Sequence, residues 1–508
     1  MKKHLKDFLY KAPIAILCAF SPHLATGDWV TTLEHTEHWA AGDAVTQNDI
    51  CSGDINGDGD PEIVSLSTTN VDGRHHAELR VSRWDGSAYN VLDEQLWSVS
   101  DQATRGRGVR CVDLVGDGAL DIVTGVDLRT ASGSETEIRV WRWDAPSESL
   151  LVEGEPLVIS GSIHALAVGD ADADGVAEII TGGGSSSTSE LELRIFRVSD
   201  SGLSEEHTED WLVDSGGGEV FGVATADVDA DGDPEIVTAS DLSDPEAMDL
   251  RIWRWNGSAL VLEAEVQWDA GGGTDARGVA VGNVDEDTLP EIAVAGTVRN
   301  TDLTHPHPLS GVVSLWQWDG ETLELEGHRV WQSLLGNVEY FGVSVANIDG
   351  AGADEVVVVG PLHEVPAQNV LRVYGWDGGH LQAEYSEEWI AEGMNDNFTY
   401  VVHTANVDGD ARVEMITGGR AVDAGAQNHH QITIWQLDWS PSFWLWSWMD
   451  RMKQVFAWEG WPFYTAFRDT LPIPWGGVVY GGILFGFSAL AVYALWRMRS
   501  FFTHNRKP

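Results

Sequence analysis

The sequence predicts an all-β fold, a seven-bladed β-propeller of four-stranded antiparallel blades, followed by one transmembrane helix near the C-terminus. Three observations lead to this prediction. One acidic motif recurs seven times along the 508 residues, each repeat also carries a strand-like run ending in a tight turn, and one uncharged run of membrane-spanning length lies near the end of the chain. Repeats of this kind bury their apolar faces only against their neighbours.

The acidic motif is clearest at Asp54, where the chain reads Asp-Ile-Asn-Gly-Asp-Gly-Asp-Pro-Glu-Ile-Val. Neighbouring copies start 56 to 64 residues apart. This distance is too long for a one-strand repeat and suits a four-stranded sheet with its turns. We therefore expect each repeat to form one blade. The other copies start at Asp113, Asp170, Asp227, Asn283, Asn347 and Asn406.

The strand-like run is typified by Leu250-Arg-Ile-Trp-Arg-Trp-Asn-Gly. Period-two alternation that ends in Asn-Gly or Asp-Gly is a strong signal for a β-hairpin. A tryptophan takes the same place in five repeats, so we expect it to pack within the blades rather than to stack on sugars. These residues are Trp84, Trp143, Trp255, Trp318 and Trp376.

Ring closure is predicted from the two ends of the repeat array. The seventh repeat lacks a fourth strand, whereas residues 32–39 match that strand in pattern. We expect this N-terminal strand to pair into the last blade, which leaves no open sheet edge. Cys51 lies three residues before its acidic motif and Cys111 lies two residues before its own. One offset is odd and the other even, so the two side chains point to opposite faces of equivalent strands. The sequence leaves open whether they pair.

The two termini indicate a single-pass membrane protein. Residues 1–27 combine lysines with the short apolar run Ala12–Phe20 and read as a signal peptide. Residues 475–496 carry no charge and are long enough to span a ~30 Å hydrocarbon core. The basic tail, residues 497–508, is then cytoplasmic and the propeller lies outside. Residues 439–474 are rich in aromatics, which favours a segment at the membrane surface or, alternatively, one packed under the propeller.

A Phe-Gly pair precedes the acidic motif in two repeats, at Phe221-Gly222 and Phe341-Gly342. Together with Asp-x-Asp-x-Asp-Gly-x-x-Glu-Ile-Val, this pair resembles the FG-GAP or VCBS repeats of integrin-α-type propellers. The resemblance covers residues 28–438 and implies a seven-bladed propeller with calcium in its blade loops. It does not imply an integrin, and membrane-anchored FG-GAP ectodomains are the nearer comparison.

The chemistry of the loops agrees with calcium. Alternate oxygen-bearing residues on a short turn can surround a hard cation that takes six to eight oxygens. The family pattern implies side-chain ligands at loop places one, three, five and nine, and a backbone carbonyl at place seven. The flanking strands exclude an EF-hand, in which helices flank the loop. The predicted metal residues are Asp54, Asn56, Asp58, Asp60, Glu62, Asp170, Asp172, Asp174, Glu178, Asp227, Asp229, Asp231, Asp233, Glu235, Asn283, Asp285, Asp287, Glu291, Asn406, Asp408, Asp410 and Glu414.

The seven loops differ in their ligand sets. The loops at Asp170 and Asp227 are the most complete, and the loop at Asp54 is close behind. Clustered acids repel each other unless a cation neutralises them, so we expect structural calcium in about five loops rather than plain hairpin turns. The loops that start at Asn283 and Asn406 lack the turn glycine but keep their ligands. The loops that start at Asp113 and Asn347 have an apolar residue at a ligand place, Val115 and Ala351 respectively.

The sequence excludes some functions and leaves others open. A net charge of −50 argues against nucleic-acid binding, which requires basic patches. We find no common hydrolase, phosphate-loop or zinc motif, and Arg110 and His403, expected to line the central channel, have no recognisable catalytic partner. We therefore expect a membrane-anchored binding or adhesion module for an extracellular protein or glycan. The alternatives are a structural subunit of a larger membrane complex and a surface hydrolase or lyase.

Overall fold

The computed structural model describes residues 28–440, apart from residues 41, 43–45, 100–102, 131–132, 185–189, 200–201, 213–216, 245, 300–306 and 334. Residues 29–438 form one compact unit. The predicted signal peptide, transmembrane helix and cytoplasmic tail, and the aromatic segment beyond Ser440, lie outside the described residues. Within the described part of the chain, no helix has the length and apolar character needed to cross a membrane.

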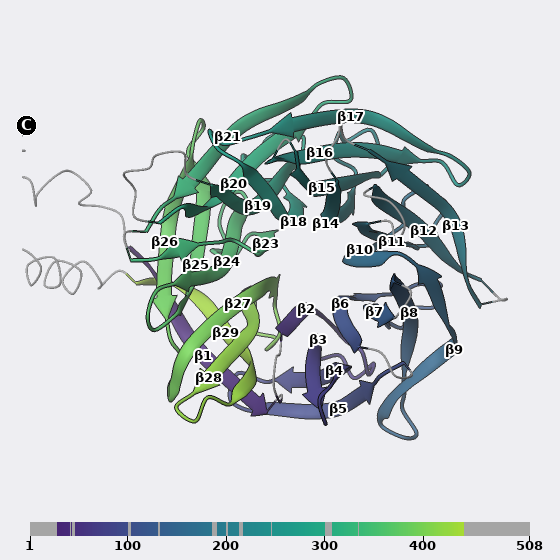
Figure 1. The fold of residues 1–508 in the computed structure, drawn as a ribbon, viewed down its shortest axis with the longest axis vertical. Coiled ribbons are helices and arrows are strands. Elements are labelled where there is room, and N and C mark those ends of the chain that lie inside the picture. The colour runs from purple at the N-terminus through teal and green to yellow at the C-terminus, as the bar shows by residue number, and fades with distance from the viewer. Residues whose placement is uncertain are drawn as a thin grey trace, which may run out of the picture. The chain divides into compact units, whose positions relative to one another are not determined.

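The predicted seven-bladed, all-β propeller is confirmed. Seven antiparallel sheets follow one another around a ring, each running from an inner strand to an outer one (Figure 1). In blades one to four the chain enters at the inner strand and leaves at the outer one. Their strands are β2 (Thr46–Gly53), β3 (Glu62–Val71), β4 (Arg74–Trp84) and β5 (Tyr89–Trp97); β6 (Ala103–Val112), β7 (Asp121–Thr130), β8 (Gly133–Asp144) and β9 (Ser149–Ser160); β10 (Ser162–Gly169), β11 (Glu178–Gly184), β12 (Leu191–Ser199) and β13 (Gly202–Trp211); and β14 (Gly218–Ala226), β15 (Glu235–Ser243), β16 (Glu246–Trp255) and β17 (Leu260–Trp268).

Blades five to seven continue the ring with two variations. In blade six the inner strand is split into two pieces that both pair with the second strand. In blade seven the outer strand comes from the N-terminus. The strands are β18 (Thr274–Gly282), β19 (Glu291–Arg299), β20 (Leu309–Trp318) and β21 (Leu323–Trp331); β22 (Asn337–Val338), β23 (Gly342–Ala346), β24 (Glu355–His363), β25 (Gln368–Trp376) and β26 (Leu381–Trp389); and β27 (Met394–Ala405), β28 (Glu414–Asp423), β29 (Asn428–Ser440) and β1 (Asp28–Ala40).

The N-terminal strand closes the ring as predicted. The sheet order β1-β29-β28-β27 places β1 as the fourth strand of blade seven. Its side chains also reach both neighbouring blades: the Thr31 hydroxyl is hydrogen-bonded to the Tyr385 hydroxyl of blade six, and Trp39 Nε1 donates to Glu78 Oε1 of blade one at 2.6 Å. Closure therefore ties the last blade to its neighbours on both sides.

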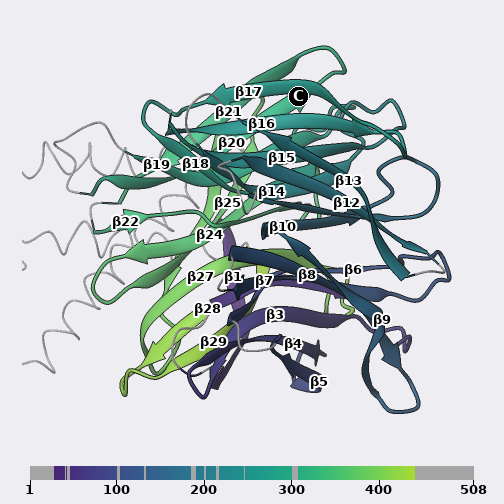
Figure 2. The same cartoon turned by 45° about the vertical axis from the view of Figure 1, so that its right-hand side comes forward.

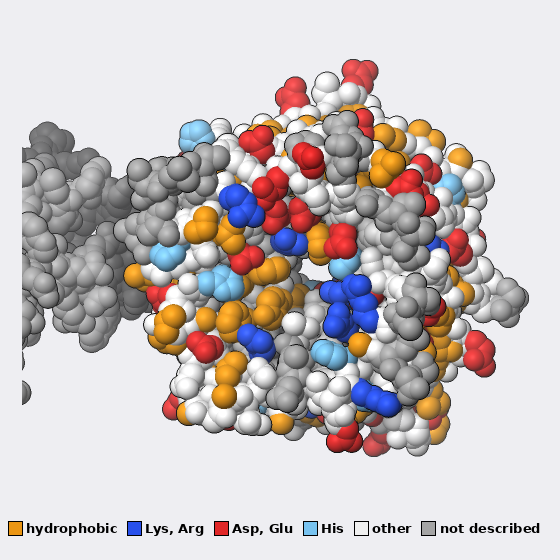
Figure 3. Space-filling view, in the orientation of Figure 1, with side chains coloured by type: hydrophobic (Ala, Val, Ile, Leu, Met, Phe, Trp, Pro, Cys, Tyr) orange, Lys and Arg blue, Asp and Glu red, His pale blue; other side chains and the backbone are white. Residues whose placement is uncertain are grey.

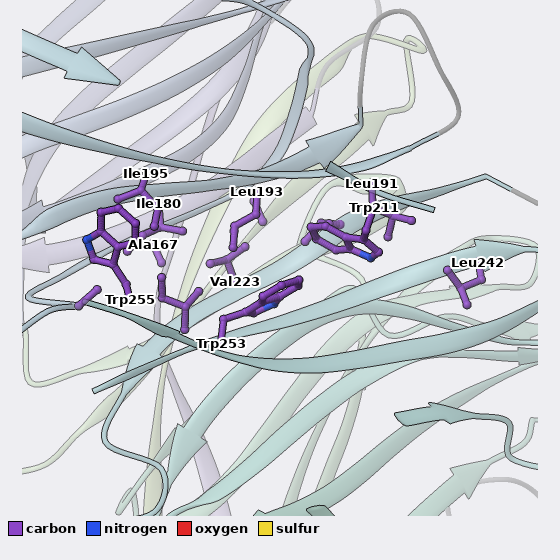
Figure 4. Close-up of a cluster of buried hydrophobic side chains, with 14 residues drawn as sticks. Ala167, Ile180, Leu191, Leu193, Ile195, Trp211, Val223, Leu242, Trp253 and Trp255 are labelled. Carbon is purple, nitrogen blue, oxygen red and sulfur yellow. The ribbon is translucent and has the colours of Figure 1, made fainter. Parts of the chain in front are cut away.

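The apolar core lies between neighbouring sheets, which Figure 2 shows following one another around the ring. Second strands such as β24 are covered on both faces and accordingly read as nearly continuous apolar runs. One cluster joins Ile180 of blade three to Trp253 and Trp255 of blade four (Figure 4). The expectation that the repeated tryptophans pack within the blades is confirmed: Trp84, Trp255 and Trp318 are buried, and Trp143 and Trp376 are partly buried against core clusters.

Cys51 and Cys111 form a disulfide, with their Cα atoms 5.7 Å apart. The bond joins β2 of blade one to β6 of blade two. The offsets of the two cysteines from their motifs could not decide this pairing. The two inner strands belong to different sheets, so no hydrogen-bond register relates the side chains of one strand to those of the other.

Candidate functional site: carboxylate loops and channel rim

Each acidic motif forms the turn between the inner strand of a blade and its second strand. In blade three, Asp170 at place one accepts backbone hydrogen bonds from Asp174 at 3.0 Å and from Gly175 at 2.8 Å. The same pair of bonds recurs in blades one and four. The first carboxylate of these loops therefore shapes the turn in addition to facing a potential ion.

The acid at place nine is fully or almost fully buried in every blade. In blade four, Glu235 Oε2 accepts a hydrogen bond at 3.1 Å from the backbone N–H of Val228 at place two. Burial raises the pKa of Glu235 to about 7 and that of Glu355 to about 8. This acid fastens the loop to the blade. The equivalent bonds run to Glu62, Asp121, Glu178, Glu291, Glu355 and Glu414 from Ile55, Leu114, Ala171, Val284, Ile348 and Val407.

Several acidic clusters could hold a metal ion. Five groups of three acids among the described residues bring one ligand oxygen each to within 4.8 Å of one another. Four of the groups belong to predicted loops, in blades three, four, five and seven. The fifth, in blade six, combines two acids of a loop that the sequence marked as damaged with Glu384 of the outer strand. The groups are Asp170, Asp172 and Glu178; Asp227, Asp229 and Asp231; Asp285, Asp287 and Glu291; Asp349, Glu355 and Glu384; and Asp408, Asp410 and Glu414.

An arginine on the third strand faces the place-nine acid in blades one to four. The strand register places Arg254 directly opposite Glu235. Its guanidinium lies 2.9 Å from Asp231 Oδ2 and 3.2 Å from Glu235 Oε1, which are the acids at places five and nine. The equivalent residues Arg83, Arg142 and Arg197 also form ion pairs with the place-five acids of their loops.

Neutral residues take this position in blades five to seven. Gln317 Nε2 donates to Asp287 at 3.0 Å and to Glu291 at 3.3 Å, and Gln436 Nε2 donates to Asp410 at 2.9 Å. Blade six has Gly375 there, and a Cβ atom on it would collide with the Glu384 carboxylate. These three loops therefore receive no positive charge from this position.

The middle of the channel wall contains the two residues that were expected to line it. Arg110 of β6 forms an ion pair with Asp49 of β2, and His403 of β27 is hydrogen-bonded through Nε2 to Ser52 Oγ at 2.9 Å. Burial, together with the nearby Arg110, lowers the pKa of His403 to about 4. His403 is therefore neutral at physiological pH.

A rim of seven side chains, one from each blade, surrounds one mouth of the channel. Each lies six residues before its acidic motif, where the inner strand has a β-bulge or, in blade six, a break between β22 and β23. A bulge re-aims the side chain that it carries. All seven residues are half-buried. We define the rim as Asn48, Arg107, His164, Phe221, Arg277, Phe341 and Tyr400.

Rim side chains contact one another across three of the blade boundaries. The rings of His164 and Phe221 lie 4.9 Å apart, the Arg277 guanidinium lies 4.6 Å from the Phe221 ring centroid, and Phe341 meets Tyr400 edge-on at 5.6 Å. Figure 3 shows one face of the ring, with a small central opening bordered by basic, histidine and hydrophobic side chains. The rim thus combines cationic and aromatic side chains.

Residues 54–124 match the family model described as FG-GAP-like repeat. The prediction of FG-GAP-like repeats in a seven-bladed propeller is confirmed. No curated protein matches the chain.

Solved structures similar to this FG-GAP-like propeller include three with low sequence identity. The rhamnogalacturonan lyase YesW is 15% identical, with a TM-score of 0.43 over 79% of this chain and 74% of that one. The Dos1 propeller is 9% identical, with a TM-score of 0.40 over 81% and 95%. The Nup133 β-propeller domain of Vanderwaltozyma polyspora is 10% identical, with a TM-score of 0.40 over 73% and 91%. Similarity at this level carries no information about function.

The Phe-Gly pair of these repeats has a structural explanation. Phe221 and Phe341 are rim residues, and the glycine after each lets the inner strand of the next blade approach closely: a Cβ on Gly222 would lie 2.9 Å from the backbone nitrogen of Val279, and one on Gly342 would lie 2.8 Å from that of Val402. The rim as a whole was missed from the sequence. The signal that could have revealed the rim is the fixed distance of six residues before each acidic motif. Asn48 and Arg107 lie at this distance too, although neither resembles Phe.

Proposed function

We propose that this chain is a membrane-anchored, extracytoplasmic binding and adhesion module, which holds a protein or glycan ligand at the rim. One observation carries the proposal. At the loop end of the inner strands, the repeats place the same chemistry in every blade, a buried acid bonded to a backbone N–H group. At the rim end, the equivalent position changes from blade to blade among amide, guanidinium, imidazole, phenyl and phenol.

A purely structural role would not require this variety. A residue that only packs against the next blade meets the same geometry seven times, so the same small set of residues would serve throughout. Half-buried aromatic and charged side chains grouped in one place are typical of ligand sites. The rim supports recognition of a ligand more than it supports packing.

The predicted location agrees with the disulfide. Disulfides persist in oxidising compartments outside the cytosol. The bond between Cys51 and Cys111 therefore supports export of the propeller. The anchor of this proposal is the predicted helix of residues 475–496, with the rim and loops on the extracytoplasmic side.

We further propose that the ion held by the acidic loops is structural Ca²⁺. The donor set consists of carboxylate oxygens on a short turn, which suits this hard cation. Blades three and seven support the proposal best, because Glu178 and Glu414 are fully buried and their Oε1 atoms have no hydrogen-bond partner among the described residues. Bound calcium would neutralise Asp408, Asp410 and Glu414 together.

The binding proposal is tested with the full-length chain in detergent and calcium, probed against a panel of glycans and cell-surface proteins. The double substitution Phe221→Ala and Tyr400→Ala should abolish whatever binding the wild type shows. Leu151→Ala is the matched control, because Leu151 is 52% exposed on the outer strand β9. Binding that survives the rim substitutions contradicts the rim as the site.

The two alternatives predict other outcomes of the same experiment. A surface hydrolase or lyase would release shortened products from a glycan of the panel. A structural subunit would bind nothing in the panel and would instead co-purify with the same membrane proteins whether or not its rim is mutated.

A further inference from the structure

The charge that faces the acidic loops divides the ring into two groups of blades. In blades one to four an arginine lies opposite the place-nine acid, and in blades five to seven a neutral residue does. Counted by acids alone, the loops of blades three and four are the most complete metal sites of the chain. These same loops contain a guanidinium among their carboxylates.

We propose that the arginines of blades one to four neutralise their loops from within and exclude calcium, so that calcium binds only in blades five, six and seven. The inference rests on the calcium binding proposed above and narrows it to the loops in which no arginine lies opposite the place-nine acid. In blade seven this position is Gln436, and the Arg412 guanidinium of the loop donates to the Gln436 Oε1 atom at 3.0 Å. The arginines concerned are Arg83, Arg142, Arg197 and Arg254.

The guanidinium of blade four lies among the acids of its loop. It lies within 4.0 Å of four acids of the loop, including Asp229 at 3.9 Å and Asp233 at 3.1 Å. On its other side, the same guanidinium donates a hydrogen bond from Arg254 Nε to Glu263 Oε1 at 2.8 Å. A side chain held on both sides does not leave the loop freely, and a calcium ion beside it would meet like-charge repulsion in a partly buried site.

Blades five and six keep the outer-strand glutamate but lack the arginine. Glu263, Glu326 and Glu384 take equivalent places, each in the bulge of the fourth strand of its blade. In blade five the Oε2 atom of Glu326 is buried without a hydrogen-bond partner among the described residues. In blade six the Glu384 carboxylate joins Asp349 and Glu355. No arginine forms an ion pair with the acids of these two clusters in the described part of the chain.

Blade six shows how a loop that has lost ligands regains one. Ala351 stands where the other loops have the place-five aspartate, and Gly375 stands where blades one to four have arginine. The missing side chain at position 375 leaves room for Glu384, whose carboxylate lies over the glycine. The outer strand therefore supplies the oxygen that the loop lacks.

The experiment exchanges the facing residue between the two groups of blades. Equilibrium dialysis of the full-length chain in detergent against radioactive Ca²⁺ counts the ions bound per chain. We expect no more than three for the wild type, one more for Arg254→Gln, and one fewer for Gln317→Arg. Arg251→Gln is the matched control, because Arg251 lies on the opposite face of β16 and pairs with Asp249 and Glu265; it should leave the count unchanged.

The outcomes separate this inference from the calcium proposal. A wild-type count above three, or an Arg254→Gln chain that gains no ion, overturns the inference and leaves calcium binding itself intact. A wild type that binds no calcium contradicts the calcium proposal and overturns this inference with it, since no ion then occupies blades five to seven. If that variant does not fold, Arg197→Gln in blade three provides the same comparison, and Gln317→Arg tests it in reverse.

Discussion

The two ends of each inner strand follow different rules. At the loop end, seven acids at one position make the same hydrogen bond to a backbone N–H group, and all seven are fully or almost fully buried. At the rim end, seven residues at one position have different chemistry, and all are half-buried around the channel mouth. Repetition therefore marks what holds a blade together, and in the proposed function the departure from repetition marks the surface that meets a partner.

Removal of β1, the strand that closes the ring, should have the largest effect, because both the loop end and the rim end depend on the closed ring. Without β1, blade seven loses its fourth strand and the contacts that tie it to blades one and six. We expect deletion of residues 28–40 to abolish cooperative thermal unfolding and to remove calcium binding and ligand binding together. Loss of only one of the two would show that the ends do not depend on a common closed ring.

The loop end should tolerate substitution poorly. Glu235→Ala leaves the buried N–H group of Val228 without its acceptor and Arg254 without one of its partners. Leaving a buried N–H group without its acceptor costs ~1–3 kcal/mol, and the cavity left by the deleted buried side chain adds to this loss. Chemical denaturation measures the loss, and Glu235→Gln is the control, because its amide oxygen can still accept the hydrogen bond. A change below about 1 kcal/mol for Glu235→Ala would contradict the structural role of place nine.

The disulfide lies between the two ends and should contribute less. Replacement of both Cys51 and Cys111 by serine removes a crosslink between residues 60 positions apart. Such a loss costs ~2–4 kcal/mol. Unfolding of the wild type under reducing conditions should match the double variant. Equal stability of the wild type with and without reductant would show that the inner strands are held by packing alone.

His403, in the middle of the channel wall, should contribute to the pH dependence of the free energy of unfolding. Because the pKa of His403 is about 4 in the folded chain and near 6.5 in the unfolded chain, the unfolded state binds the proton first as the pH falls. His403 therefore contributes a loss of stability between pH 6.5 and pH 4, of ~1.4 kcal/mol per pH unit. The place-nine acids contribute with the opposite sign, because burial raises the pKa of Glu235 to about 7 and that of Glu355 to about 8, and the folded state then binds their protons first.

The test is the difference in the free energy of unfolding between the wild type and His403→Gln. As the pH falls from 6.5 to 4, this difference should shift against the wild type by ~1.4 kcal/mol per pH unit. Burial also lowers the pKa of His430, to about 3, but His430 is present in both proteins and cancels from the difference. His328→Gln, on the exposed face of β21, is the control and should show no such shift. A difference that is constant over this pH range would mean that His403 is solvated.

The rim should show the smallest effect on stability. Phe221→Ala removes the contacts with His164 and Arg277, and such aromatic contacts contribute ~0.5–1.5 kcal/mol each. We expect a loss of stability below that of Glu235→Ala in the same blade, with ligand binding lost. A destabilisation equal to that of Glu235→Ala would break the comparison, since the rim would then be a packing position.

Much of the fold could be predicted because its signals are local. Alternation followed by Asn-Gly after Trp255 specifies a hairpin within ten residues, and seven copies specify seven blades. The closing strand at residues 32–39 was also predicted, since a four-stranded repeat that ends one strand short requires a complement. The acids of the loops were found for the same reason, because each motif is one continuous segment.

Local sequence is sufficient to specify the repeat: the number of blades, the hairpins, the closing strand and the composition of each loop. Tertiary structure decided what faces each loop and what gathers at the rim. Arg254 meets Glu235 only through the register of two strands, Glu384 reaches Asp349 only through a bulge, and Cys51 meets Cys111 only between two sheets. The physical reason is that hydrogen-bonded turns depend on neighbouring residues, whereas charge neutralisation and contacts between blades depend on residues that folding brings together from distant positions.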